Sequence, residues 1–221
     1  MKVIQLHYPQ SIDLKGYCAC IGNFDGVHIG HQKLLETASQ SGYLPAVITF
    51  DPHPEEILRP DEEHLYLTSQ EAKMAWLRKY GVETVVVISF TEAFARLSKE
   101  EFLEYLNSFG LSMLVCGYNF HFGCQGKGNV DYLLNSENAE FEIVVCNPVM
   151  INETVVSSTR IKQYIRDNEM AEAVEMLGHE YTVEIEAAGG EIVKIHNVAP
   201  EDGLDINVSE LTDGTYEIVF N

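Results

Sequence analysis

The chain of 221 residues is 46% hydrophobic and 22% charged, a balance typical of a globular protein with one core and a small additional element. Its 34 acidic and 14 basic residues give a formal net charge of -20, which would repel a phosphate backbone and argues against nucleic acid as a partner. No apolar run approaches the roughly 20 residues that cross a bilayer, and the N-terminus has no signal-peptide pattern. We therefore expect a cytoplasmic protein with no membrane partner.

Short apolar runs alternate with helical patterns over the first two thirds of the chain. Strands are expected at residues 17–21, 44–50, 84–88, 111–116 and 141–146. Helices are expected at residues 31–39, 69–80, 99–109 and 130–136. Continuous apolar strands that alternate with helices predict an α/β fold, a Rossmann-like parallel sheet with helices on both faces. Such sheets bind ligands beyond the carboxyl ends of their strands.

The pattern changes towards the C-terminus. An irregular link is expected at residues 147–153, followed by helices at 157–166 and 170–177. Apolar and polar residues then alternate, first at Tyr181, Val183 and Ile185 and later at Leu204, Ile206 and Val208. Turn signals stand at Gly189-Gly190 and Asp213-Gly214. Together these features predict a small antiparallel β-meander in residues 181–221.

The cysteines form an odd set. They are Cys18, Cys20, Cys116, Cys124 and Cys146. At least four of them lie in or beside apolar runs, which is typical of reduced thiols in a core. Cys18 and Cys20 would share one face of a strand, as two metal ligands could, but no second pair of ligands completes a zinc site. Metal binding by cysteines is therefore the less favoured alternative.

A glycine-bearing loop joins the first expected strand to a helix, with the sequence GNFDGVHIGHQ at residues 22–32. Backbone amides at such a helix start point towards an anion. His28 and His31 are three residues apart, so they would lie on one helix face and reach the same group. Gly26 and Gly30 have no Cβ to keep a nucleotide from the backbone. We interpret the loop as a phosphate site; two structural histidines and a tight turn are the alternative.

This run is similar to the signature of nucleotidylyltransferases with a His-x-Gly-His motif. In its extended form it resembles the FMN adenylyltransferase module of bacterial FAD synthetases. The resemblance covers roughly residues 15–182 and ends with LGHEY at 177–181, which is similar to the hinge into a riboflavin kinase module. The Gly-x-Pro-Thr-Ala-Asn motif of that kinase is absent. The resemblance therefore implies ATP and FMN as substrates, FAD as product and Mg²⁺ with ATP, without riboflavin kinase activity.

Three further motifs of the module follow in order: TFDPHP at 49–54, GYNFHFG at 117–123 and VSSTRIK at 156–162. Taken with the loop, the resemblance implies ATP contacts from Gly22, Asn23, Phe24, Asp25, Gly26, Gly30, Ser157, Ser158 and Thr159. It implies FMN contacts from Phe50, Pro52, His53, Asn119 and Phe122, and catalytic roles for His28, His31, Arg160 and Lys162. No protein ligand of a metal is predicted. Each motif also has a plain structural interpretation: a strand-ending turn, an aromatic turn that fills the core, and a helix N-cap.

Lys162 stands where the family has arginine. Lysine keeps the charge but loses the two-pronged donor geometry, so a contact to the departing pyrophosphate would be weaker or shifted, and Arg160 is the candidate to share it.

The function expected from the sequence is transfer of AMP from ATP to FMN. Residues 1–180 would form the nucleotidyltransferase domain, and 181–221 a β-meander that is the remnant or replacement of the kinase module. A nucleotidyltransferase with another phosphorylated acceptor is the nearest alternative. A catalytically weak or inactive flavin or nucleotide sensor is the alternative from another functional class.

Overall fold

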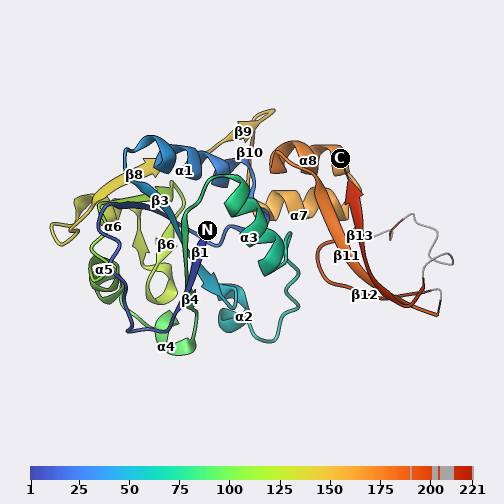
Figure 1. Ribbon diagram of the computed structural model, residues 1–221, viewed down its shortest axis with the longest axis horizontal. Coiled ribbons are helices and arrows are strands. Elements are labelled where there is room, and N and C mark those ends of the chain that lie inside the picture. The colour runs from blue at the N-terminus through green and yellow to red at the C-terminus, as the bar shows by residue number, and fades with distance from the viewer. Residues whose placement is uncertain (190, 201–203, 205–211, 221) are drawn as a thin grey trace. The chain divides into compact units, whose positions relative to one another are not determined.

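The computed structural model describes residues 1–189, 191–200, 204 and 212–220 (Figure 1). The chain forms two compact units. The first comprises Met1–Phe24, His31–His64 and Leu77–Pro148, and the second Asp25–Gly30, Leu65–Trp76 and Val149–Asn221. The sheet belongs to the first unit, and the candidate residues are distributed over both.

The first unit is built on a six-stranded sheet with the order β1-β4-β3-β2-β5-β8. Its strands are β1 (Lys2–Leu6), β2 (Tyr17–Ile21), β3 (Leu44–Asp51), β4 (Thr84–Ser89), β5 (Met113–Gly117) and β8 (Glu142–Cys146). Every neighbouring pair runs parallel. All six residues of β4 are buried, as in strands that are covered on both faces. The α/β prediction of a Rossmann-like parallel sheet is confirmed.

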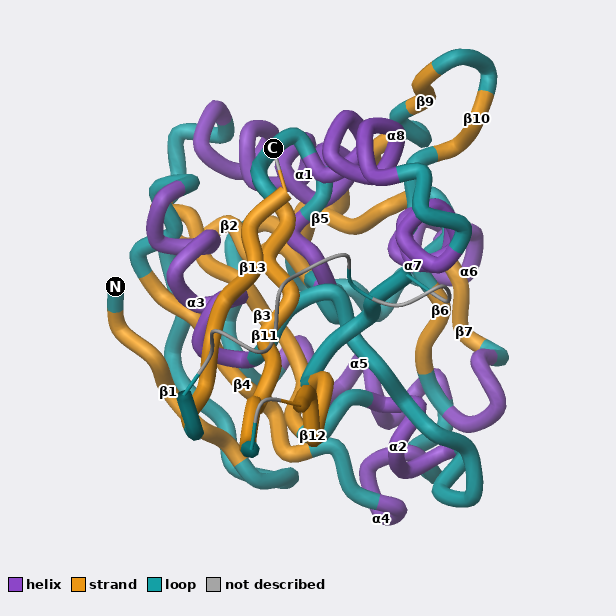
Figure 2. The backbone as a smooth tube through the Cα atoms, turned by 90° about the vertical axis from the view of Figure 1, so that its right-hand side faces the viewer, coloured by secondary structure: helices purple, strands orange, loops and turns teal. Residues whose placement is uncertain are grey.

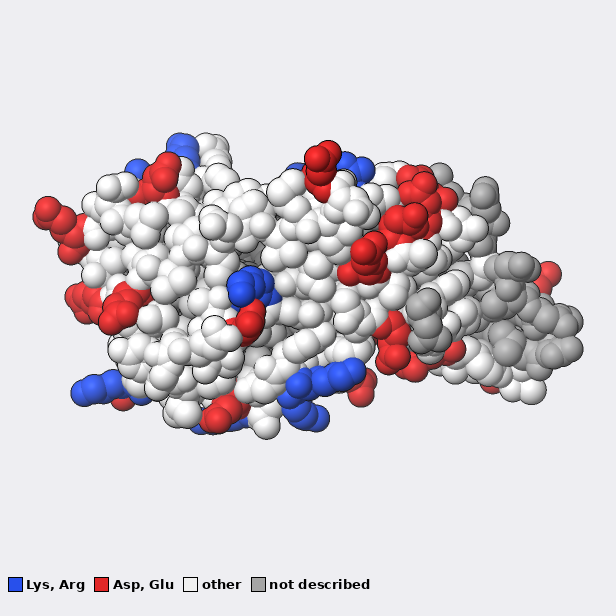
Figure 3. Space-filling model, turned by 90° about the horizontal axis from the view of Figure 1, so that it is seen from above, with Lys and Arg blue, Asp and Glu red and all other residues white. Residues whose placement is uncertain are grey.

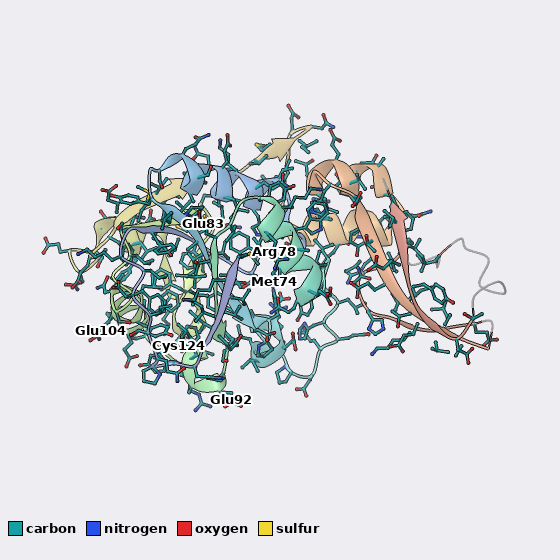
Figure 4. The ribbon with its side chains drawn as sticks, viewed as in Figure 1. Met74, Arg78, Glu83, Glu92, Glu104 and Cys124 are labelled. Carbon is teal, nitrogen blue, oxygen red and sulfur yellow. The ribbon has the colours of Figure 1, made fainter. Side chains whose placement is uncertain are left out.

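Helices connect these strands. They are α1 (Ile29–Gln40), α2 (Pro54–Leu58), α3 (Gln70–Lys79), α4 (Glu92–Ala95), α5 (Lys99–Asn107) and α6 (Val130–Asn135). Helix α5 shows how the sequence sets such an element: Ser98 caps it and Glu101 completes a capping box. Its buried face, Phe102, Leu103 and Leu106, joins the core under the sheet. The charged side chains of Glu92 on α4 and Glu104 on α5 are labelled in Figure 4 and remain exposed.

The strand order places a switch point between β2 and β5. From β2 the chain adds β3 and β4 on one side of the sheet and later β5 and β8 on the other. Such a switch leaves a crevice at the carboxyl ends of the two central strands. Here those ends are Ile21 and Gly117, which run directly into the GNF and YNFHF segments of the motifs.

Several short elements were absent from the sequence prediction. Strand β1 pairs with β4 at the edge of the sheet, and its burial is too uneven to resemble a buried apolar run. The link at 147–153, expected to be irregular, instead contributes to a hairpin of β9 (Met150–Ile151) and β10 (Thr154–Val155). Two further two-residue strands, β6 (His121–Phe122) and β7 (Gly128–Asn129), also pair antiparallel. Elements this short contain too few residues to show a periodic pattern of apolar side chains.

The C-terminal part of the second unit has its own core. Helices α7 (Ser158–Arg166) and α8 (Met170–Leu177) precede a three-stranded antiparallel sheet with the order β12-β11-β13 (Figure 2). Its strands are β11 (Tyr181–Ala188), β12 (Glu191–Ile195) and β13 (Gly214–Phe220). Alternate residues of β11 are buried in a cluster with Ile161, Ile165 and Leu177 of the two helices. The predicted antiparallel element is confirmed, but β13 pairs with β11 and not with β12, so the described strands do not form the expected meander. Gly190, Ile206 and Val208 lie outside the described residues.

The cysteines match the prediction of core thiols. All are unpaired; Cys18, Cys20, Cys116 and Cys146 are buried and Cys124 is half-buried. Burial raises the pKa of the Cys116 thiol to about 12 and that of Cys20 well above its usual value. These thiols are therefore poor nucleophiles and poor metal ligands. Separately, none of the helices in the described ranges has the length and apolarity needed to span a membrane.

Candidate functional site

The loop after β2 is fixed by the end of β3. The amide of Gly22 donates to the carbonyl of Ile48 at 3.1 Å, and Thr49 Oγ1 donates to the carbonyl of Asn23 at 3.2 Å. Phe24 is fully buried with a positive φ of 55°. A positive φ is uncommon outside glycine, and such strain often marks a functional site. The first three predicted ATP residues therefore lie at the switch point in a constrained backbone.

His31 lies in the first turn of α1. Its ring centroid is 4.9 Å from that of Phe24, with the planes tilted by 38°, and its Nδ1 atom is buried. The residue as a whole is half-buried, so part of the ring remains accessible. Phe24 thus sets the orientation of one of the two predicted catalytic histidines.

The motif after β3 combines a buried phenylalanine with a helix cap. Phe50 is buried and its ring centroid lies 5.7 Å from that of Phe90 and 6.0 Å from that of Phe94. The Asp51–Pro52 peptide bond is cis. His53 caps α2, because its Nδ1 accepts the amide of Glu55 at 3.3 Å. The strand-ending turn expected from the sequence is therefore present, and roles for Phe50, Pro52 and His53 in FMN binding stay predictions.

The motif after β5 has one buried and one exposed candidate. The ring of Phe122 stacks at 5.5 Å on Phe120 and lies 4.9 Å from that of Phe102, in the core. A Cβ on Gly128 would come within 2.5 Å of the Phe122 ring, so the backbone lies directly against it. Asn119, in contrast, is exposed. Phe122 thus packs in the core and Asn119 is exposed, and roles for both residues in FMN binding stay predictions.

In the second unit, Asp25–Gly30 forms a strained turn. Asp25–Val27 is a short 3-10 helix in which Gly26 has a φ of 78° and Val27 a φ of 39°. A β-branched residue in this left-handed region is an outlier. A Cβ on Gly26 would lie 2.6 Å from Leu67 Cδ1, so only glycine fits. We take this stored strain as a sign of function.

His28 is the most perturbed titratable group of this turn. Burial lowers its pKa to about 4; the charge of Asp25 and a hydrogen bond of the ring to its own backbone oppose that shift, and the electrostatic interaction with His179 adds to it. A neutral imidazole has one N–H to donate and carries no charge at neutral pH. The ring lies against Gly30, where an added Cβ would be 3.0 Å from His28 Cε1. His28 is therefore a buried, neutral ring held beside Gly30, and its donation to an anionic oxygen stays a prediction.

The buried His28 predicts a pH-dependent stability. Its pKa is about 4 in the fold and 6.5 when unperturbed, so between these values the unfolded chain binds the proton more readily. The free energy of unfolding should fall by about 3 kcal/mol as the pH drops from 6.5 to 4, and His28 should have no effect above that window. Urea unfolding of wild-type and His28→Asn protein at several pH values measures the difference. An equal fall of the free energy of unfolding in both proteins would show that the lowered pKa does not belong to His28.

Asp25 connects the turn to other parts of its unit. Its Oδ2 lies 2.9 Å from Lys162 Nζ, with only 5% and 15% of the two side chains exposed. Its Oδ1 accepts the amide of Leu67 at 2.8 Å. The ammonium group of Lys162 also lies 4.9 Å from the Tyr66 ring centroid. Lys162 is thus held by a buried ion pair, and its contact with phosphate stays a prediction.

The N-terminus of α7 meets the same turn. Ser158 Oγ donates to the carbonyl of Asp25 at 2.9 Å. Ser157 is the N-cap, accepting the amide of Arg160 at 3.2 Å, so the capping interpretation is confirmed. Thr159 and Arg160 are exposed, and the guanidinium of Arg160 lies 5.9 Å from the Tyr164 ring centroid. First-turn amides of such a helix favour an anion.

A phosphate site in the second unit needs local positive charge because the side chains around it are mostly acidic. In Figure 3 acidic side chains gather over the part of the molecule that holds the C-terminal elements. Exposed acids of these elements include Glu172, Glu175, Glu180 and Glu217. A phosphate group would therefore rely on helix termini and the few bases described above.

Sequence reasoning missed the contacts that fix the turn. Thr68 Oγ1 accepts the amide of Gly26 at 3.2 Å, and His179 Nε2 lies 2.9 Å from the carbonyl of Gly26. No role was predicted for Thr68, and His179 was taken only as part of a hinge. The Leu-Gly-His order after a helix was the available signal, since a glycine there reverses the chain direction.

The comparison with protein families settles the affiliation. The model of the family described as FAD synthetase matches residues 11–160, which include all four motifs except the last two residues of the fourth. The chain belongs to the FAD synthetase family.

Curated relatives agree with this membership. A bifunctional riboflavin kinase/FMN adenylyltransferase of Listeria monocytogenes is 34% identical over 192 residues, which is 82% of this chain and 61% of that protein. A protein of the same description from Bacillus subtilis is 31% identical to this chain, and the match again covers 61% of that protein. An FAD synthetase of Listeria monocytogenes is 34% identical over 224 residues, 98% of this chain and 87% of that protein. The chain thus spans about three fifths of these bifunctional relatives.

Solved structures share the fold. A crystal structure described as a macrolide-efflux protein from Streptococcus pneumoniae matches 90% of this chain and 72% of its own, with a TM-score of 0.74 and 26% identity. A pantothenate synthetase from Thermus thermophilus has a TM-score of 0.50 at 13% identity, covering 78% of this chain and 71% of its own, which shows likeness of fold alone.

Proposed function

We propose that this chain is an FMN adenylyltransferase that makes FAD and pyrophosphate from FMN and ATP. The observation that carries the proposal is the strained turn before α1, which holds a neutral, buried His28 at the start of that helix in a chain of the FAD synthetase family. A phosphate oxygen of FMN attacks the α-phosphorus of ATP. The bond from that phosphorus to the bridging oxygen breaks, and pyrophosphate leaves with the electron pair. No covalent enzyme intermediate is required.

The residues of the turn would act by positioning and by charge stabilisation. His28 donates a hydrogen bond to a phosphate oxygen, and His31, one helical turn further along the chain, assists it. The backbone of Gly22–Gly30 and the hydroxyls of Ser157–Thr159 would hold the nucleotide, with Arg160 and Lys162 as the nearby bases. Magnesium that arrives with ATP would take its ligands mainly from phosphate and water. Asp25, whose carboxylate pairs with Lys162, is already engaged, so we name no protein ligand.

FMN would occupy the crevice at the switch point of the sheet. The accessible Asn119 would hydrogen-bond the flavin edge, and His53 and Pro52 would border the ring from the end of β3. The buried Phe50 and Phe122 would support these contacts from beneath.

A panel of phosphorylated compounds tests which acceptor the protein uses. Purified protein is incubated with ATP, Mg²⁺ and either FMN, pantetheine phosphate or nicotinamide mononucleotide, and the products are separated by chromatography. We expect adenylylation of FMN alone. Transfer to another acceptor would replace FMN as the substrate, and binding of both ligands without any transfer would favour a sensor.

Riboflavin should not be a substrate of this chain. We propose a division into a nucleotidyltransferase domain, 1–180, and a small antiparallel β element, 181–221, that is a remnant or replacement of a kinase module. Strands β11, β12 and β13 share one small core with α7 and α8, and the sequence lacks the kinase motif. With riboflavin, ATP and Mg²⁺, chromatography should detect neither FMN nor FAD. Either product, formed by protein free of contaminating kinase, would refute this prediction. The cytoplasmic location stays a prediction.

A further inference from the structure

His179 is placed by the end of α8. Gly178 is the C-cap of this helix, with a φ of 71° in the left-handed region, and its amide donates to the carbonyl of Val174. This reversal turns the chain back towards the strained turn. Leu177 lies against the site of Gly26, where an added Cβ would be 3.1 Å from Leu177 Cδ2. The residues at the end of this helix therefore meet Gly26 through two side chains, the apolar one of Leu177 and the imidazole of His179.

Both ring nitrogens of His179 face carbonyl oxygens. Nε2 lies 2.9 Å from the carbonyl of Gly26, and Nδ1 lies 2.7 Å from the carbonyl of Glu180. Carbonyl oxygens only accept hydrogen bonds, so the ring of His179 meets the Gly26 carbonyl as a donor through Nε2. The geometry thus places an imidazole donor against the backbone of the turn.

Trp76 holds the imidazole from its face. The two ring centroids are 3.8 Å apart and the planes differ by 22°, a stacked arrangement. Trp76 lies on α3 between Met74 and Arg78, which are labelled in Figure 4. It is the only tryptophan in the sequence. Its fluorescence can therefore report on His179 without interference from another indole.

His179 also acts on the catalytic candidate. Its electrostatic interaction with His28 contributes, after burial, to the lowered pKa of that histidine. The segment from Gly26 to His28 is short and contains the strained Val27. Fixing the Gly26 carbonyl therefore restricts the backbone that carries His28.

We propose that His179 is a positioning residue, clamped by Trp76, that holds the Gly26 carbonyl and so keeps the turn in the conformation that receives ATP. It acts through the backbone and not by contact with the substrate. The inference rests on the proposed function of this turn. Because His179 contacts the carbonyl of Gly26 in this turn, the loss of its side chain should weaken the use of ATP and leave the KM for FMN unchanged.

The test compares His179→Ala and His179→Arg with a matched control, His196→Ala. His196 belongs to the same unit and bonds Glu186 at 3.0 Å, in the small antiparallel β element. Steady-state FAD formation gives kcat/KM for ATP and KM for FMN. We expect His179→Ala to lower kcat/KM for ATP about tenfold, the scale of one hydrogen bond. Arginine, which donates in several directions and stacks on indole, should restore most of the loss, and His196→Ala should match the wild type.

A binding measurement separates this inference from the proposed function. Titration with α,β-methylene ATP, followed by Trp76 fluorescence, needs no turnover. We expect weaker binding of the analogue by about tenfold in His179→Ala alone. If wild-type protein makes no FAD, the proposed function fails, and this titration still decides the inference. Unchanged analogue affinity in folded His179→Ala, an equal loss in His179→Arg, or an equal loss in His196→Ala would overturn it.

Discussion

Replacing His28 or His31 with alanine should lower the rate of FAD formation by about a hundredfold or more, the scale of losing one preorganised contact in a transition state. His28 is buried and neutral, so its contribution would be a directed N–H and not a charge. His28→Asn keeps a donor of neutral charge and should lose less activity than His28→Ala. The measurement is kcat with saturating ATP and FMN.

Two other histidines supply controls for these variants. His64 bonds the carbonyl of Arg59 and His196 bonds Glu186, and neither belongs to the proposed site. Alanine at either position should leave kcat close to that of the wild type. Near-normal rates in both His28→Ala and His31→Ala would show that these histidines are structural.

Lys162→Met should destabilise the protein by about 3–5 kcal/mol, because it leaves the buried carboxylate of Asp25 without its cation. Lys162→Arg keeps the charge and should retain most of the stability, and it should preserve or raise activity if the side chain reaches phosphate. The free energy of unfolding in urea measures the loss.

The double variant Asp25→Asn/Lys162→Met isolates the ion pair. Removing both charges should recover part of the loss, since no buried charge remains unpaired. If Lys162→Met is as stable as the wild type, the pair is not closed in solution. A large loss of activity in Lys162→Arg at full stability would mean that the site requires lysine.

The fold was largely predictable because its main strands are buried on both faces. A run such as Val85-Val86-Val87-Ile88 is apolar at every position, which is the mark of a central parallel strand. Strand β1 escaped prediction because an edge strand alternates irregularly, and α2 and α4 are shorter than the window in which a helical period is visible.

The candidate site was predictable only as a set of motifs. Nothing local in the sequence indicates that Asp25 and Lys162 form an ion pair, because that contact depends on how α7 folds back within its unit. The same holds for His179 and Gly26. Aromatic motifs were ambiguous for a physical reason: Phe122 is the same residue type whether it covers a ligand or fills a core, and in the structure it is buried in the core.

The most direct test of the account is adenylyl transfer itself. Protein at residues 1–221 is incubated with FMN, Mg²⁺ and ATP labelled at the α-phosphate, and FAD and pyrophosphate are quantified together. The account predicts label in FAD and one pyrophosphate released for each FAD formed, with no labelled protein intermediate. Folded protein that binds both FMN and ATP yet yields no labelled FAD would contradict it.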